Sequence, residues 1–382
     1  MKKSQRKGLR TWIEVDRKAI KHNISVFRSL LNQKTKFMAV IKSNAYGHSI
    51  IDFANEMVRL KVDFLGVDSI TEGLVLRKEG IRVPILVLGY TLPEMLAEAA
   101  GKDISLTVST FELLKYIVAK HKSFKKPLKI HVKVDTGMHR QGFLMRDITI
   151  VLKILNSISK TTLQVEGLFS HFATAKNPGF PKGTEEQLEN FKLWIKLFKQ
   201  AGFEPITHTA ATAGTMLFPE SHLDMVRVGI GLYGLWPAKE VKMALAKKIS
   251  LHPVLSWKSL IAEIKKLPKG SRIGYDLTES LSKDGVVAIV PVGYWHGYPR
   301  SLSSLGKMLV KGKLCKILGR VSMDMICINV SNVKNLRVGD EVVVIGNDSD
   351  STCSMEGISN ISNLSWYETV TRLNPLIKRV YL

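Results

Sequence analysis

The first part of the chain carries short apolar runs, rich in β-branched residues, separated by stretches with helical periodicity. Eight such runs occur, at 36–42, 63–69, 84–90, 104–110, 128–135, 165–173, 206–212 and 224–230. Segments such as TFELLKYIVAKH and TEEQLENFKLWIKLFKQAG, with apolar residues at helical spacing, lie between most of them. A continuous apolar run is typical of a strand buried on both faces, and strand–helix alternation is typical of parallel pairing. The pattern therefore predicts a (β/α)8 TIM barrel.

The pattern also predicts how the rest of the chain is organised. A helix is expected before the first strand, with Asp16 as its N-cap and an apolar face that includes Ile20 and Ile24. After about residue 245, strands separated by Gly, Pro, Asn and Asp turns follow with almost no helix, until a final helix in SWYETVTRL. We therefore predict an α/β protein with a TIM-barrel domain over 1–245 and a mainly β C-terminal domain over 246–382. Residues 1–15 are expected to give a strand to the β domain.

Composition limits the class of protein. A chain of 382 residues with 45% hydrophobic content can bury a large core. The apolar runs have strand length, so no membrane span is expected, and the basic opening MKKSQRKGLR has no apolar segment after it, which argues for a cytoplasmic protein. Cys315, Cys327 and Cys353 lie far apart with no CxxC pair, so we expect neither a disulfide framework nor a bound metal.

The formal charge of +23 would suit a nucleic-acid or membrane-surface partner. The lysines and arginines are scattered, however, and often stand at helix ends, as in KKLPKGSR and VAKHKSFKKP. No nucleic-acid-binding motif accompanies them. A generally basic surface is the favoured interpretation, and neither a nucleic acid nor a membrane is expected as a partner.

Candidate chemistry gathers where the predicted barrel strands end. In TIM barrels the active site lies at the C-terminal ends of the strands. These ends carry ionisable or hydroxyl side chains where a core would place Val or Leu: Lys42, Lys133 with Asp135, His171, Thr212 and Arg227. Lys42 stands out because an apolar strand leads directly into it, and lysine is rarely buried unless it is paired or chemically engaged.

A lysine at that position is the usual route to a Schiff base, including that of pyridoxal 5'-phosphate (PLP). PLP needs a phosphate-binding cradle, which barrels commonly build from the loops after strands seven and eight. Those loops read HTAATAGT and RVGIGLYG, and their threonine hydroxyls and glycine amides suit a phosphate. The residues alone thus favour a PLP protein without fixing its reaction.

Seven segments then carry a resemblance to a known family. They are AVIKSNAYGHS, VKVDTGMHRQGF, GLFSHFATA, DMVRVGIGLYG, PVGYWHGYPR, LGRVSMDM and WYETVTRL. In this order, from about residue 11 to the C-terminus, they resemble the barrel-type, PLP-dependent alanine racemases. The resemblance implies a barrel followed by a β domain, the interconversion of L-alanine and D-alanine, and a role in supplying D-alanine for peptidoglycan.

By the same resemblance, Lys42 is the Schiff-base lysine and one of two catalytic bases, and Tyr275 is the opposite base. Racemisation needs two such groups because one proton leaves Cα on one face and another returns on the opposite face. Further positions correspond to the family's cofactor-binding groups: Tyr46, Tyr367, Thr212, Gly229 and Ile230 at the phosphate, Arg227 at the pyridine nitrogen, and His171 between Arg227 and Tyr275, with His208 nearby.

The resemblance also implies the substrate side of the site. Arg140 corresponds to a substrate-carboxylate neighbour, Met323 to an amide beside the substrate oxygen, Asp324 to a lining residue and Tyr294 to the entrance. Lys133 matches a lysine that is often carbamylated in this family. Family members are homodimers in which the residues matching Tyr275, Tyr294, Met323 and Asp324 in one chain complete the barrel site of the other.

Some positions depart from the family. GYWHGY carries Trp295 and His296 where a small residue and an acid are usual, so a bulky ring and a potential cation are expected beside the entrance, which affects substrate access. Ala211-Thr212 replaces an Asn-Ser pair, and His139 stands where glycine is common. Because the catalytic groups are kept, racemase chemistry is still expected.

Three other functions stay open. The same chemistry could prefer serine or a basic amino acid. Decarboxylases share this architecture, but they need their own glycine-rich phosphate loop and a cysteine–acid pair that the sequence lacks. A PLP-binding or nucleic-acid-associated protein without turnover is disfavoured, because a binder does not need the two opposed bases Lys42 and Tyr275.

Overall fold

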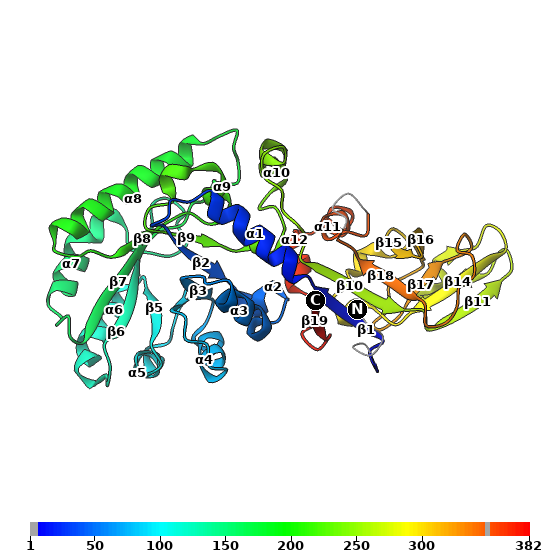
Figure 1. The fold of residues 1–382 in the computed structure, drawn as a ribbon, viewed down its shortest axis with the longest axis horizontal. Coiled ribbons are helices and arrows are strands. Elements are labelled where there is room, and N and C mark those ends of the chain that lie inside the picture. The colour runs from blue at the N-terminus through cyan, green and yellow to red at the C-terminus, as the bar shows by residue number, and fades with distance from the viewer. Residues whose placement is uncertain (1–6, 348–351) are drawn as a thin grey trace. The chain divides into compact units, whose positions relative to one another are not determined.

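The structure is a computed structural model that describes residues 7–347 and 352–382 (Figure 1). The chain forms two compact units. One unit, which we call the barrel unit, comprises Lys21–Ala45 and Ile50–Leu251. The other, the β unit, comprises the chain up to Ile20, the short segment Tyr46–Ser49, and His252–Leu382.

The barrel unit contains the eight predicted parallel strands. They pair in the order β8-β7-β6-β5-β4-β3-β2-β9. A parallel bridge between Ala211 and Arg227 links the two ends of this order, so the barrel is nearly closed. The strands are β2 (Lys36–Val40), β3 (Phe64–Val67), β4 (Ile85–Val87), β5 (Ile104–Val108), β6 (Leu128–Lys133), β7 (Leu163–Phe169), β8 (Ile206–His208) and β9 (Met225–Val228).

Several strands end earlier than their apolar runs. The predicted strand 206–212 is a strand only over Ile206–His208, and the predicted strand 165–173 ends at Phe169. Beyond these strand ends, one run forms a loop that leads to Thr212 at the start of helix α9 (Thr212–Leu217), and the other forms the loop that carries His171. These residues are therefore apolar because the segments at the strand ends are buried, and not because the strand pairing extends further.

Helices cover the outside of the barrel, as α6, α7 and α8 show beside β6 and β7 (Figure 1). Asp16 caps the first helix as predicted, since its Oδ1 accepts hydrogen bonds from the amides of Lys18 and Ala19. Ser69 and Thr110 cap two others through their hydroxyl oxygens. The helices are α1 (Arg17–Ser29), α3 (Ile50–Arg59), α4 (Ile70–Lys78), α5 (Leu96–Gly101), α6 (Phe111–Lys120), α7 (Ile148–Asn156), α8 (Lys182–Gln200), α9 (Thr212–Leu217) and α10 (Lys239–Leu245).

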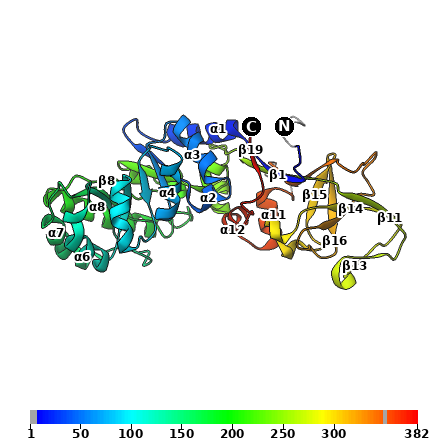
Figure 2. The same cartoon turned by 90° about the horizontal axis from the view of Figure 1, so that it is seen from below.

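The β unit is built on a nine-stranded sheet with the order β11-β14-β17-β16-β15-β18-β10-β1-β19. A separate hairpin of β12 (Arg272–Ile273) and β13 (Glu279–Ser280) lies apart from this sheet (Figure 2). The sheet strands are β1 (Thr11–Val15), β10 (Leu255–Leu260), β11 (Glu263–Leu267), β14 (Gly285–Val290), β15 (Lys307–Val310), β16 (Lys313–Leu318), β17 (Ile326–Asn329), β18 (Glu341–Ile345) and β19 (Arg379–Tyr381).

Two details differ from the prediction for this unit. Helix α11 (Met355–Ser362) was not expected, and helix α12 (Trp366–Thr371) does not close the chain. The chain continues to β19, which pairs in parallel with β1. The sequence RVY was too short to be distinguished from a tail, and its strand forms because β1 offers a free edge.

The segment Tyr46–Ser49 is tied to the C-terminal end of the chain within the β unit. Nε of Arg379 donates a hydrogen bond to the carbonyl oxygen of Gly47 at 2.9 Å. The hydroxyl of Tyr381 donates one to the carbonyl oxygen of His48 at 2.7 Å.

None of the helices in residues 7–347 and 352–382 combines the length and the apolar character that a membrane span requires.

Candidate active site

Lys42 lies two residues beyond β2, at the strand end that the sequence indicated. Its Nζ forms an ion pair with Oδ1 of Asp68 at 3.1 Å, and Asp68 in turn directly follows β3. The Lys42 side chain is 38% exposed. A lysine that is partly covered and close to the ends of two barrel strands is accessible to a small molecule bound there.

A left-handed turn follows Lys42, and this feature was not predicted. The φ values of Ser43, Asn44, Ala45 and Tyr46 lie between 49° and 56°. Such a backbone costs roughly 1–2 kcal/mol for each residue other than glycine. Glu72 and the side chain of Asn44 stabilise it, because Glu72 accepts the amide of Asn44 at 3.1 Å and Asn44 accepts the amide of Ile50 at 2.9 Å.

Strained backbone of this kind concentrates at functional sites, where the surrounding structure holds it. The strain fixes the direction in which the chain leaves Lys42. A sequence cue existed in Asn44 and Gly47, two residue types that tolerate positive φ. Alone, however, it predicts a turn and not a left-handed helix.

Positive charge gathers around Lys133, the last residue of β6. Burial, followed by the charges of Arg140, Arg227 and Lys42, lowers the pKa of Lys133 to about 8, against a weak opposing effect of Asp135. Nζ of Lys133 donates a hydrogen bond to Oε1 of Gln141 at 2.8 Å.

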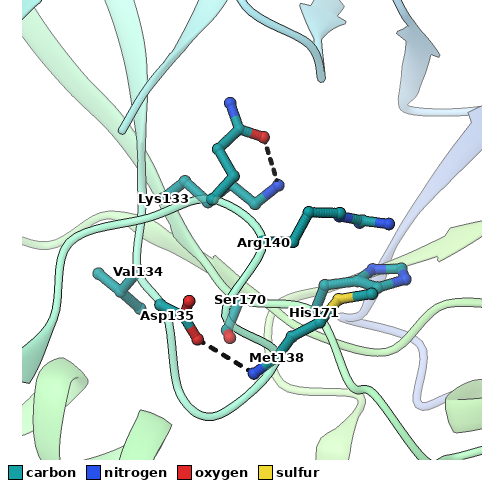
Figure 3. Close-up of a pocket in the computed structure, with 8 residues that line it drawn as sticks. Lys133, Val134, Asp135, Met138, Arg140, Ser170 and His171 are labelled. Atoms are coloured by element: carbon teal, nitrogen blue, oxygen red, sulfur yellow. Dashed lines mark hydrogen bonds between the residues drawn. The ribbon is translucent and has the colours of Figure 1, made fainter. Parts of the chain in front are cut away.

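A small hollow opens at this cluster (Figure 3). Lys133, Arg140, Asp135 and His171 line it together with Ser170 and neighbouring residues of the Asp135 loop. Two cationic side chains of this lining, Lys133 and Arg140, outnumber its one carboxylate, Asp135, so the hollow is suited to bind an anion.

The loop between Lys133 and Arg140 is organised by Asp135. Its Oδ1 accepts hydrogen bonds from the backbone amides of Gly137, Met138 and His139 at 2.9 to 3.0 Å. His139 has a φ of 55°, a conformation in which the family's usual glycine is free of strain. Asp135, which the sequence indicated only as an ionisable residue at a strand end, thus anchors the loop that leads to Arg140.

Arg227 lies on β9 and is almost fully buried. Its guanidinium donates to the carbonyl oxygens of His208, Ser170 and Thr209 at 2.8 to 3.0 Å. Burial, and then the charge of Arg140, lowers the pKa of Arg227 to about 9, so it stays charged at neutral pH.

His171 is brought to the same arginine. Nη2 of Arg227 donates to Nδ1 of His171 at 3.2 Å. Burial, followed by the neighbouring cations, lowers the pKa of His171 well below its usual value, so the ring is neutral. Because Nδ1 accepts, the ring proton sits on Nε2. His171 therefore presents a donor on the side away from Arg227.

Thr212 and Gly229 form the core of the predicted phosphate cradle. The hydroxyl oxygen of Thr212 accepts the amide of Gly229 at 3.1 Å and that of Gly231 at 3.5 Å. A Cβ atom at Gly231 would lie 2.3 Å from the ring of Phe27, so glycine is required there. The structure thus brings the two predicted glycine-rich loops together around one hydroxyl.

The two tyrosines predicted at the phosphate lie together in the β unit. The ring centroids of Tyr46 and Tyr367 are 6.3 Å apart. Burial, and then Tyr46, raises the pKa of Tyr367, so its hydroxyl stays protonated and can donate. Gly47, with a φ of 81°, packs so closely that a Cβ atom there would lie 2.3 Å from the carbonyl oxygen of Val370.

The four residues expected to serve a second chain also share one region of the β unit. The amides of Tyr294 and Trp295 donate to the carbonyl oxygens of Ser322 and Met323, each at 3.0 Å. Tyr275 begins the turn between β12 and β13. The next residue, Asp276, forms an ion pair with Arg320 at 3.0 Å, and Arg320 lies in the loop that leads to Met323. Tyr275 is 70% exposed and Met323 is 53% exposed.

His296 differs from its expectation. Its ring is buried, and Nδ1 accepts the amide of Gly293 at 3.2 Å. Burial lowers its pKa, with Arg10 adding to this effect and Asp324 opposing it, so His296 is neutral at pH 7 and not the expected cation. Trp295, by contrast, has a 57% exposed ring beside Tyr294.

Other groups of the site were missed in the sequence. Gln141 directly follows Arg140, but a lone glutamine carries no pattern that would mark it as a lysine partner. Glu72 lies on a helix thirty residues away from Lys42 in the chain. Within the residues that the structure describes, no group of three or more His, Cys, Asp or Glu side chains is placed to hold a metal ion.

Comparison with known proteins gives a consistent result across the whole chain. The model of the alanine racemase N-terminal domain matches residues 15–237, and that of the C-terminal domain matches residues 254–381. Alanine racemase 1 of Oceanobacillus iheyensis is 36% identical over 373 residues, covering 97% of this chain and 98% of that protein.

Solved structures agree. Alanine racemase of Clostridium difficile superimposes with a TM-score of 0.92 at 32% identity, covering 98% of this chain and 96% of that one. A histidine racemase of Leuconostoc mesenteroides superimposes with a TM-score of 0.87 at 30% identity, covering 98% of both chains. The chain is an amino-acid racemase and belongs to the alanine racemase family.

Proposed function

We propose that this protein is a PLP-dependent racemase that interconverts L-alanine and D-alanine. The observation that carries the proposal is the cation-rich cluster of Lys42, Lys133, Arg140 and Arg227 at the barrel strand ends, next to the Thr212 cradle. Relatives that are named alanine racemases match almost the full chain, which supports alanine as the substrate.

The donor set fits PLP and an amino acid. A phosphate group and a carboxylate together bring the negative charge that the cluster lacks. When bound, PLP supplies an electron sink that stabilises charge left at Cα. The residues proposed to hold it are Lys42, Tyr46, His171, Thr212, Arg227, Gly229, Ile230 and Tyr367.

Two bases are proposed to move the proton. Nζ of Lys42 takes or returns it on one face of Cα, and the phenol oxygen of Tyr275 does so on the other. The tautomer of His171 that the Arg227 contact implies supports this, since its Nε2–H can donate a hydrogen bond to a phenolate and favour that base. Arg140 is proposed to bind the substrate carboxylate.

The remaining assignments concern a second chain. We propose a homodimer in which Tyr275 of the partner subunit reaches the barrel site, with the partner's Tyr294, the partner's Met323 and the partner's Asp324 around the substrate. The high exposure of Tyr275 supports this, because a catalytic base on the surface of one chain needs an enclosing partner. D-Alanine made by a cytoplasmic enzyme would serve peptidoglycan synthesis, and this role is proposed from the family.

Lys133 is proposed to carry a carbamate. Its neutral amine would attack CO2, forming an N–C bond and releasing one proton to water. The resulting anion would be stabilised by Arg140, Arg227 and Lys42.

The test is a chiral assay of purified protein with PLP, in which L-alanine, L-serine, L-lysine and L-histidine are offered separately. D-Alanine should form fastest, Lys42→Ala should abolish it, and Lys36→Ala, at the exposed start of the same strand, should retain it. If no D-isomer forms although PLP binds, the proposed reaction is wrong.

A second candidate is the same chemistry on a larger amino acid. The exposed ring of Trp295 beside Tyr294, where the family usually has a small residue, is the observation that favours it. A histidine racemase with this fold shows that the architecture is compatible with a bulkier substrate. Faster formation of D-histidine or D-lysine than of D-alanine would establish this candidate.

A further inference from the structure

Four polar side chains form a continuous hydrogen-bonded chain inside the barrel. Nη1 of Arg227 on β9 lies 2.7 Å from Nδ1 of His208 on β8. Nε2 of His208 lies 2.8 Å from Nδ1 of His131 on β6, and Nε2 of His131 lies 3.1 Å from Oε2 of Glu166 on β7. This hydrogen-bonded chain therefore connects Arg227, the proposed cofactor-binding arginine, to Glu166, a carboxylate that has no part in the proposed chemistry.

The groups at the two ends of this hydrogen-bonded chain, Arg227 and Glu166, specify the same direction for every bond. A guanidinium has donors and no acceptor, so Nδ1 of His208 must accept. The proton of His208 is then on Nε2, which donates to Nδ1 of His131. The proton of His131 is likewise on Nε2 and is donated to Glu166. Both histidines are neutral Nε2–H tautomers, and Glu166 is the terminal acceptor.

The environment supports the protonation states of His208 and Glu166. Both histidine rings are fully buried, and burial, followed by the charge of Arg227, lowers the pKa of His208 well below its usual value. Burial opposes ionisation of Glu166, but hydrogen bonds from His131 and Ser105 and the charge of Lys129 outweigh it and lower its pKa. Glu166 is therefore a carboxylate at neutral pH.

Packing holds His208, in the middle of the hydrogen-bonded chain, in place. The ring of Phe169 stacks on that of His208 with centroids 4.8 Å apart and an interplanar angle of 6°. The same ring lies 5.2 Å from the guanidinium carbon of Arg227. His208 can therefore exchange its tautomer but cannot easily turn away from Arg227.

We propose that Glu166 is a positioning residue that acts through His131 and His208. It keeps Nδ1 of His208 unprotonated, so that this nitrogen accepts a hydrogen bond from Arg227. One part of this inference rests on the proposed function, namely that Arg227 is thereby placed correctly for the cofactor. If Glu166 did not impose the direction, His131 could carry its proton on Nδ1. His208 would then carry a proton on Nδ1 facing a donor of Arg227, and the two would repel.

The variant that tests this is Glu166→Gln. The amide keeps the shape but offers an NH2 group to Nε2 of His131, which permits the reversed direction. Glu56→Gln is the matched control, since Glu56 is another carboxylate of the barrel unit with little exposure but pairs with Arg59 on α3, at 2.6 Å.

The first readout needs no catalysis. Long-range 1H–15N spectra of the full chain, labelled at the histidine nitrogens and free of cofactor, report which ring nitrogen carries the proton. Signals of the two rings are assigned by their loss in His131→Asn and His208→Asn. We expect Nε2–H for both rings in the wild type and in Glu56→Gln, and a substantial Nδ1–H population in Glu166→Gln.

The second readout is the PLP dissociation constant, which should rise about tenfold in Glu166→Gln and stay unchanged in Glu56→Gln. A proton on Nδ1 of His208 in the wild type would overturn the proposal. This result does not depend on whether Glu166→Gln folds. Unchanged tautomers, or an unchanged dissociation constant, in a folded Glu166→Gln would also overturn it. A protein with the expected tautomers but no racemase activity would contradict the proposed function and leave the hydrogen-bonded chain intact.

Discussion

Gln141 holds Lys133 through a neutral amide. Its Oε1 accepts a hydrogen bond from Nζ of Lys133 at 2.8 Å, and its Nε2 donates to the hydroxyl of Ser109 at 3.1 Å. This contact supplies no full negative charge, so the amine is held in place while burial, and then Arg140 and Arg227, disfavour its protonation. Rotation of the amide would turn its NH2 group toward Lys133, where it could donate to a carbamate oxygen.

The first prediction concerns this carbamate. A pKa of about 8 leaves roughly one amine in ten neutral at pH 7, and the fraction rises as the pH approaches 8. At fixed CO2 pressure, 13C-labelled CO2 should give a carbamate resonance whose intensity increases from pH 6.5 to 8. Lys133→Ala should remove it.

Lys258→Ala is the control for the carbamate. Lys258 is also partly buried, but Glu341 and Glu14 outweigh its burial and raise its pKa, so its amine stays charged. The resonance should persist in this variant. A resonance that survives Lys133→Ala, or none in the wild type, contradicts the assignment.

The second prediction concerns the shared site. Lys42→Ala and Tyr275→Phe should each be inactive alone. If Tyr275 acts in the partner's barrel, a mixed dimer of the two variants contains one intact site. Random reassembly of an equal mixture should then restore about a quarter of the wild-type activity. Mixing that restores nothing, although the variants exchange subunits, would place both bases in the same chain.

The third prediction concerns the segment after Lys42. Gly47→Ala should lower the free energy of unfolding by about 3 kcal/mol or more, because the added Cβ meets Val370 and φ is positive. Gly80→Ala is matched to it, with a φ of 82° and nothing within 4 Å of the added atom, and should cost about 1 kcal/mol. Urea unfolding measures both, and equal losses would show that the contact with Val370 is unimportant.

The fourth prediction concerns the phosphate cradle. Thr212→Val keeps the shape but removes the hydroxyl that accepts the amide of Gly229, and should raise the PLP dissociation constant about tenfold. Thr215→Val removes a buried hydroxyl of the same helix that donates to the carbonyl oxygen of Ala211 and accepts neither glycine amide, and should leave PLP binding near the wild-type value. Fluorescence titration of the cofactor-free protein compares them. A similar change in both would assign the effect to helix α9 and not to the cradle.

The fifth prediction concerns substrate size. Trp295→Ala removes an exposed ring beside Tyr294 that a larger side chain would contact, and should lower kcat/KM for lysine or histidine relative to alanine by roughly tenfold. Leu305→Ala, another exposed apolar residue of the β unit, should leave this ratio unchanged. The chiral assay measures both ratios, and an unaltered ratio in Trp295→Ala would exclude this ring as a determinant of specificity.

Much of the fold could be read from the chain because the relevant forces are local. A run such as KFMAVIK can be buried on both faces only in a covered parallel sheet, and Asp16 caps a helix with its own neighbours. The position of Lys42 at a strand end followed from the same pattern. The lengths of the strands did not, because the loops at the strand ends are as apolar as the strands.

Other features depended on residues far apart in the sequence. No sequence pattern marked His131 or Glu166, and the hydrogen bonds that join them to His208 exist because β6, β7 and β8 are neighbours in the barrel. The neutral state of His296 likewise follows from burial, which composition does not reveal.

The eight barrel strands, the β domain and the residues that resemble the family's site could all be predicted from the order of residues along the chain. The tertiary structure decided the left-handed turn after Lys42, the amide that holds Lys133 and the direction of the hydrogen bonds that lead from Arg227 to Glu166. The physical reason is the range of the interactions. Periodic burial and capping act within one element, whereas a proton's position and a buried charge are set by groups that folding alone brings together.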